Sequence, residues 1–286
     1  MAKKKKSSKA KTRKTTTKAT TVNKSVKTAK KITSASLYKW NIALAVIFAA
    51  QAVAILVISK TVTLPIVTHF LTTDSLASQA AGRTVLAPAV RHLFDIHIAS
   101  LVAAFLLVSA AAHGALATVH RKTYEAGLTR RVNKTRWIDY GIGASLMMGV
   151  IAMINGVHDI SSLLMMTALV VLLHGLAYKT ELYNKAVKQI NRLSLGGILV
   201  AGGAVWLTID IYVKGAIVYG TGLARYIYWM DGITFVLLLA IAANIWLVAR
   251  QKGKWADYLY GERTYMTLSF LVRTALAWQI YVGLLR

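Results

Sequence analysis

Long apolar stretches alternate with short polar segments from residue 37 to the end of the chain. A helix needs roughly 20 mainly apolar residues to cross a hydrocarbon core about 30 Å thick. Stretches of about this length cover residues 37–58, 92–119, 137–156, 160–178, 195–213, 226–249 and 265–285. The pattern predicts an all-α membrane protein, with a bundle of seven transmembrane helices over residues 37–286 whose immediate partner is the lipid bilayer.

Two segments fall outside this pattern. Residues 1–31 carry 13 of the 35 Lys and Arg residues and no acid. They lack apolar periodicity, so burial cannot offset the entropy of ordering them, and we predict a disordered polybasic tail over residues 1–36. The long connection over residues 59–91 contains the β-branched run TVTLPIVTHFLTT, which predicts a short hairpin outside the bundle.

The distribution of basic residues predicts the orientation, because cationic loops resist translocation. If the tail is cytoplasmic, 28 of the 35 Lys and Arg residues lie on the cytoplasmic side and six lie outside. We therefore expect a multi-pass protein of the plasma membrane, with its N-terminus in the cytoplasm and its C-terminus outside.

Composition narrows the class further. The mean hydropathy of +0.52 excludes an ordinary soluble domain, and the absence of cysteine excludes disulfides and thiolate metal sites. The histidines are too scattered to predict a metal site. No phosphate-binding glycine loop or nucleophile motif occurs, so we expect no enzyme. The net charge of +25 comes mainly from the tail, which either serves topology alone or binds anionic lipid or nucleic acid.

Arg273 is the one Lys or Arg residue deep inside a predicted span. Charge at that depth costs a few kcal/mol, which makes the residue a functional candidate. A guanidinium stays protonated and needs a carboxylate or a wet cavity. Asp139, near the start of the third span, is the partner that we expect.

Other polar residues in the spans leave alternatives open. We place Asp95, Asp210 and Asp231 in the outer halves of helices. There Arg91, Lys214 and Arg225 are available to neutralise them, or the acids form a cation or proton path. His113 and His174 either pack in the core or line a polar cavity.

Small residues recur at a spacing of four, which lets helices approach closely. The residues are Gly141, Ser145 and Gly149 in the third span, and Gly197 with Ala201 in the fifth. They mark either internal packing or a dimer face.

The segment GKWADYLYGERTYMTLSFLVRTALAWQIYVG, residues 253–283, resembles the heliorhodopsin family. That family carries a GKW…YxxGE run, a Leu-Ser pair, a retinal-binding lysine four residues after the serine, and a LAWQ block. Arg273 occupies the lysine position. The matching residues are Gly261, Glu262, Leu268, Ser269, Ala277, Trp278 and Gln279.

The resemblance extends into the other spans. RWIDYGIGASLMMGVIAM resembles the family segment whose glutamate is the counterion of the protonated Schiff base, which places Asp139 at that position. AAFLLVSAAAHG resembles the segment with a polar-cavity histidine, which places His113 in such a cavity. In the first span, aligned through Asn41, the other cavity histidine becomes Phe48. Trp206 resembles an aromatic pocket residue of the fifth span.

The resemblance implies a cytoplasmic N-terminus, a homodimer, and retinal as the cofactor. Retinal is held by condensation with an uncharged lysine amine, and a permanently charged guanidinium is a very poor nucleophile for that reaction. We therefore expect no covalent chromophore. Arg273 would instead replace the protonated Schiff base electrostatically and face Asp139.

Three functions remain open at this point. The first is a non-pumping sensory or signalling protein, which acts on an unknown cytoplasmic partner and is blind to light or uses a non-covalent ligand. The second is a transporter or channel that uses the intramembrane acids. The third is a membrane anchor that presents the polybasic tail to anionic lipid or nucleic acid.

Overall fold

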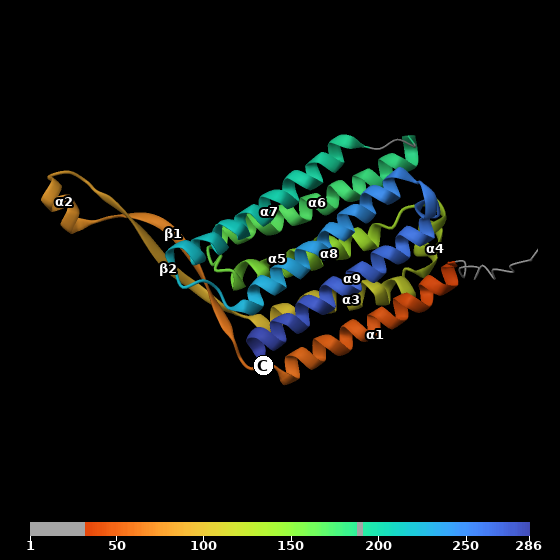
Figure 1. The fold of residues 1–286 in the computed structure, drawn as a ribbon, viewed down its shortest axis with the longest axis horizontal. Coiled ribbons are helices and arrows are strands. Elements are labelled where there is room, and N and C mark those ends of the chain that lie inside the picture. The colour runs from red at the N-terminus through yellow and green to blue at the C-terminus, as the bar shows by residue number, and fades with distance from the viewer. Residues whose placement is uncertain (1–31, 188–190) are drawn as a thin grey trace, which may run out of the picture. The chain divides into compact units, whose positions relative to one another are not determined.

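The computed structural model describes residues 32–187 and 191–286, so residues 1–31 of the tail predicted over residues 1–36 lie outside the described residues. The described part contains seven helices that are long and apolar enough to cross a membrane, which confirms the predicted bundle (Figure 1). They are α1 (Ser34–Ile58), α3 (Ile98–Ala117), α5 (Lys134–Ile154), α6 (Ile160–Val187), α7 (Arg192–Tyr219), α8 (Arg225–Arg250) and α9 (Tyr258–Ile280).

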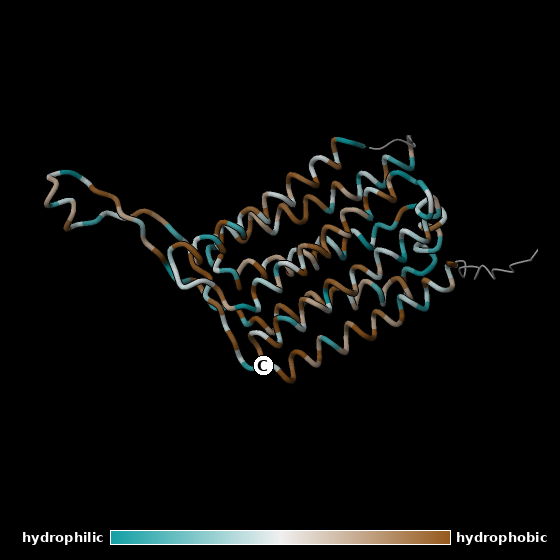
Figure 2. The backbone as a smooth tube through the Cα atoms, viewed as in Figure 1, coloured by the Kyte–Doolittle hydropathy of each residue, from teal (hydrophilic) through white to brown (hydrophobic). Residues whose placement is uncertain are grey.

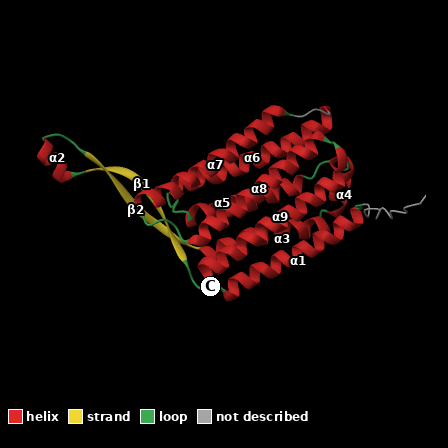
Figure 3. Ribbon diagram, in the orientation of Figure 1, coloured by secondary structure: helices red, strands yellow, loops and turns green. Residues whose placement is uncertain are grey.

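Shorter elements connect the spans (Figure 3). α4 (Arg121–Arg130) joins α3 to α5, a 3-10 turn (Gly253–Ala256) precedes α9, and a π-helical turn (Tyr281–Leu285) continues it. The connection from α1 to α3 holds β1 (Thr63–Thr73), α2 (Ser75–Ala81) and β2 (Leu86–His97).

Hydrophobic residues predominate along the spans, and hydrophilic residues gather mainly toward the helix ends and connections (Figure 2). α1 packs on α3, α3 on α5, α5 on α6, and α6 on α7, while α8 packs on α9. α9 also contacts α1 and α3. α5 has the most buried span of the seven, and it therefore places its polar residues in the middle of the protein.

Capping residues explain two helix starts that differ from the prediction. Thr33 accepts a hydrogen bond from the Ser36 backbone N–H, so α1 begins at Ser34, inside the segment predicted as tail. Asp257 caps α9 through the Leu259 backbone N–H at 3.0 Å, which starts this helix seven residues before the predicted span. α6 also ends later than predicted, at Val187 and not at residue 178.

The second predicted span was wrong at its start. Residues 92–97 belong to β2, because their backbone pairs with β1, and the helix begins only at Ile98. Asp95 therefore lies in a strand opposite Pro65, and not in a helix.

The predicted hairpin is present and extends to His97. β1 and β2 pair antiparallel from Thr63–His97 to Thr73–Leu86, with an irregularity at Ile66/Val67. α2 closes its far end, away from the helices (Figure 1). At its base, Ile66 is buried and the Val67 N–H donates to the His158 carbonyl at 3.0 Å. The base of the hairpin is therefore attached to the bundle.

The small-residue stripes lie against neighbouring helices. The Ser145 hydroxyl donates to the Thr167 carbonyl of α6 at 3.2 Å. A side chain built on Gly149 would also meet Thr167, and one built on Gly197 would meet Leu176 at 2.8 Å. These contacts support the internal-packing interpretation of both stripes.

Candidate functional site

Arg273 and Asp139 meet in the interior of the bundle. Arg273 Nη2 lies 3.1 Å from Asp139 Oδ1, and each residue is less than 5% exposed. Arg273 Nη1 also donates to the Ser269 hydroxyl, one turn earlier on α9. The Ser109 hydroxyl of α3 donates to Asp139 Oδ1 at 3.0 Å. The pair therefore joins α5 and α9, and α3 supports its carboxylate.

Two neighbours shape the space around the guanidinium. The Tyr140 ring centroid lies 5.2 Å from the Arg273 guanidinium carbon, within cation–π range. Gly143 follows Asp139 by one helical turn, and a Cβ there would lie only 2.9 Å from Arg273 Nη2. The absence of a side chain at Gly143 leaves the room that the guanidinium occupies.

A small polar cavity of about 20 Å³ adjoins this pair, large enough for about one water molecule. Its lining includes Asp139, Ser269 and His113. His113 Nδ1 lies 2.7 Å from Asn41 Oδ1 of α1, and the Phe48 ring stacks at 5.9 Å. Three predicted site residues, His113, Asp139 and Ser269, thus line the cavity beside Arg273, and Phe48 packs behind His113.

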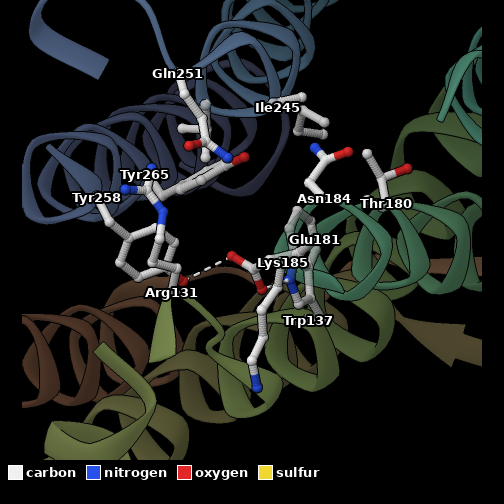
Figure 4. A pocket seen from close by; sticks show the side chains of 13 residues that line it. Arg131, Trp137, Thr180, Glu181, Asn184, Lys185, Ile245, Gln251, Tyr258 and Tyr265 are labelled. Carbon is white, nitrogen blue, oxygen red and sulfur yellow. Dashed lines mark hydrogen bonds between the residues drawn. The ribbon is translucent and has the colours of Figure 1, made fainter. Parts of the chain in front are cut away.

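A second buried charge cluster lies at the predicted cytoplasmic end. Arg136 of α5 binds Glu262 of α9 through Nη1 and Glu181 of α6 through Nη2, the latter at 2.6 Å. The Trp137 indole N–H and the Tyr258 hydroxyl each donate to Glu181 at 2.7 Å (Figure 4). One cation and two carboxylates thus hold three helices together. We call these three residues the Arg136 cluster.

Sequence reasoning missed the Arg136 cluster. Glu181 lies beyond the predicted end of its span, and Glu262 was noted only as a family motif residue. Tyr124 of α4 also approaches Glu262, at 3.5 Å, and burial raises the pKa of Tyr124 to about 12. The small polar cavity is lined by Arg136 and Glu262 as well as by Asp139, so it lies between the two charge clusters. The combination of Arg136, Trp137 and two spaced glutamates was the available signal.

A larger apolar cavity of about 260 Å³ lies among α5, α6, α7 and α8, and we call it the α7–α8 cavity. It is lined by His174 and by Trp206, the aromatic pocket residue that the resemblance places in the fifth span. Arg273 does not line it, and α9 contributes none of its described lining residues. The structure therefore separates Trp206 from the charged pair.

The remaining predicted acids have local partners. Asp95 pairs with His92 at 2.9 Å on the exposed hairpin, and not with Arg91. Asp210 binds Lys214 at 2.6 Å on α7, which agrees with the ion-pair alternative. Asp231 accepts from Asn155 at 3.1 Å, and no bond to Arg225 occurs among the described residues. The described residues contain no cluster of three His, Asp or Glu side chains that could hold a metal.

Seven apolar helices around buried charged side chains define a multi-pass membrane protein of the rhodopsin-like type. The family model Heliorhodopsin matches residues 37–285, and the chain therefore belongs to the heliorhodopsin family. No curated protein matches the chain. Retinal is the cofactor that this family implies in general.

Proposed function

We propose that this chain is a non-pumping, non-enzymatic signalling protein of the plasma membrane that works without covalently bound retinal. The observation that carries the proposal is the Arg273–Asp139 pair, with its 3.1 Å contact in the buried interior. The resemblance of the last span assigns the retinal-binding lysine to the position of Arg273. The same resemblance assigns the counterion to Asp139.

The residues present do not fit retinal attached as an imine. When bound in this way, retinal absorbs visible light and changes shape. Attachment needs a neutral amine, whereas Arg273 carries a permanent charge and bonds to Asp139 and Ser269. No lysine lines the α7–α8 cavity in the described part of the chain. These observations support the loss of the covalent chromophore.

The ion pair supplies a physical reason for the fold to persist without retinal. A protonated Schiff base would place one positive charge on α9, opposite a carboxylate on α5. The Arg273 guanidinium places the same charge there permanently, and the longer arginine compensates for the shorter aspartate. The helix-to-helix attraction is therefore retained without a chromophore.

The positions of the acids favour signalling over transport. Asp95 and Asp210 are exposed or half-buried and pair locally, and Asp231 bonds to Asn155. None of these three lines the polar cavity that contains Asp139 in the described structure. By contrast, the Arg136 cluster lies at the predicted cytoplasmic end, where a signalling partner would bind. A homodimer belongs to the same proposal and follows from the resemblance alone.

The test is a visible spectrum of the purified full chain after expression with all-trans retinal, beside an Arg273→Lys variant. We expect the native chain to show no red-shifted band, and the lysine variant to form pigment because Asp139 is already placed as its counterion. Reduction with borohydride, which traps an imine, should label only the variant. A pigment in the native chain would overturn the proposal.

A further inference from the structure

The α7–α8 cavity is almost wholly apolar. His174 and Trp206 are the two described lining residues whose side chains carry nitrogen. The other lining residues are hydrocarbon or thioether side chains and glycines. A volume of about 260 Å³ approaches the roughly 300–1,000 Å³ typical of ligand pockets. Size and lining together suit an apolar molecule with one polar group.

His174 presents one specific polar group to this space. Its Nδ1 lies 2.7 Å from the Val170 carbonyl oxygen of the preceding turn, so Nδ1 carries the proton and donates. Nε2 is then an acceptor. It has no hydrogen-bond partner among the described residues, and unlike His113 Nε2 it is not completely buried. The cavity therefore offers a neutral acceptor that only a hydrogen-bond donor can satisfy.

The cavity opens toward the lipid between α7 and α8. Three of its lining residues are also exposed on the outside of the bundle: Leu199 at 67%, Phe235 at 40% and Leu239 at 50%. α7 packs mainly on α6, and α8 packs mainly on α9. Trp206 and Phe235 meet edge to face across the gap, with their centroids 5.1 Å apart. A ligand dissolved in the bilayer can thus enter sideways.

We propose that the α7–α8 cavity binds a lipid-soluble alcohol whose hydroxyl donates to His174 Nε2. An aldehyde or ether oxygen can only accept and leaves Nε2 unsatisfied, and an ionised carboxylate would lose its hydration in apolar walls. An uncharged alcohol satisfies the acceptor without burying a charge. The inference rests on the proposed function, because it requires that no attached retinal fills the space.

His174 also connects the cavity to the charged interior. Its ring packs edge to face on Tyr140 at 5.8 Å, and the Tyr140 ring contacts the Arg273 guanidinium. The Tyr140 hydroxyl donates to the Tyr265 carbonyl at 2.8 Å, and the Tyr265 ring lies against Arg136. A bound alcohol thus changes the surroundings of His174, which packs on Tyr140. Tyr140 in turn contacts both α9 and Arg273.

The experiment uses the purified full chain in lipid nanodiscs, with all-trans-retinol as a fluorescent probe and retinyl methyl ether as its counterpart without a donor. We expect the native chain to bind retinol about 3- to 10-fold more tightly than the ether, the usual net effect of one hydrogen bond. His174→Leu should bind both probes with equal affinity. Equal affinities in the native chain, or a preference that survives in His174→Leu, would overturn the inference.

Two glycine variants on α7 provide the matched control. A Cβ atom added at Gly202, which lines the cavity, or at Gly215, which does not, would meet nothing within 4 Å. Gly202→Phe should weaken binding of both probes at least tenfold, and Gly215→Phe should leave it unchanged. Unaltered binding in Gly202→Phe contradicts the site even if His174→Leu fails to fold. Neither probe contains an aldehyde, so these results are independent of whether retinal forms a pigment.

Discussion

Arg273 on α9 and Asp139 on α5 form an ion pair with a 3.1 Å contact, and both residues are buried in the interior of the bundle. Burial removes the hydration of both charges, and the pair is tolerable only because each compensates the other. Ser269 and Ser109 supply the additional hydrogen bonds. The pair is thus a single electrostatic unit between two helices, and single substitutions should reveal this.

Replacing Asp139 with Asn should lower the melting temperature clearly. The variant leaves the Arg273 guanidinium buried without a counter-charge, which costs about 3–5 kcal/mol. Thermal unfolding in detergent, followed by circular dichroism, measures the effect. A melting temperature equal to that of the native chain would refute the pairing.

Two further variants separate the ion pair from general sensitivity to substitution. Asp210→Asn removes an exposed partner of Lys214 and should change the melting temperature little. The double variant Asp139→Leu/Arg273→Met removes both buried charges and should be more stable than Asp139→Asn alone.

Gly143 and Gly141 give a second, matched test of the same geometry. Alanine is favoured over glycine in a helix by about 1 kcal/mol. A Cβ at Gly141 meets nothing within 4 Å, so Gly141→Ala should raise the melting temperature. A Cβ at Gly143 would lie 2.9 Å from Arg273 Nη2, so Gly143→Ala should displace the guanidinium. Its melting temperature should therefore not rise as that of Gly141→Ala does. Equal effects of the two alanines would contradict the close approach.

Much of the bundle could be predicted because a membrane span is a local property of about 20 residues. The ends of the spans could not, since polar residues such as Glu181 and Glu262 continue helices and bury their side chains. Residues 92–97 read as helix because their apolar content suits both structures. Their strand pairing with residues 63–67 depends on contacts about 30 positions away in the chain.

In the candidate site, too, local features could be predicted from the sequence and contacts between distant residues could not. Arg273 was predicted to need a carboxylate or a wet cavity because it lies deep in a span, and Asp139 was the partner expected. The partners of Glu181 and the separation of Trp206 from Arg273 depend on how helices are arranged, which residue spacing does not indicate. His174 was left open between core and cavity, and only the bond from Nδ1 to Val170 identifies its free acceptor.

Arg136→Gln should destabilise the protein more than any surface arginine does. Arg136 neutralises Glu181 and Glu262 together, so the variant leaves two buried carboxylates close to each other. The expected loss is at least about 3–5 kcal/mol in the free energy of unfolding. Arg121→Gln is the control, since Arg121 and Glu125 form a pair that is about half exposed on α4, and its melting temperature should not change measurably. Similar losses in the two variants would contradict the role of the cluster.

Asp159 should make the attachment of the hairpin sensitive to acid. Hydrogen bonds hold the pKa of Asp159 below its usual value of about 3.9. The bond from the Ser162 backbone N–H has the largest effect, and His69 provides another. Because the folded-state pKa is the lower one, the stabilisation is complete above about pH 4 and is lost as the pH falls through the folded value. Asparagine caps helices equally well but does not titrate in this range, so Asp159→Asn is the matched variant. Limited proteolysis of the hairpin is measured between pH 7 and pH 3 with an acid-stable protease. The native hairpin should be cleaved more slowly than that of Asp159→Asn at neutral pH, and this difference should disappear only near pH 3. A difference between the two proteins that stays constant across this range would rule out the carboxylate as the titrating group.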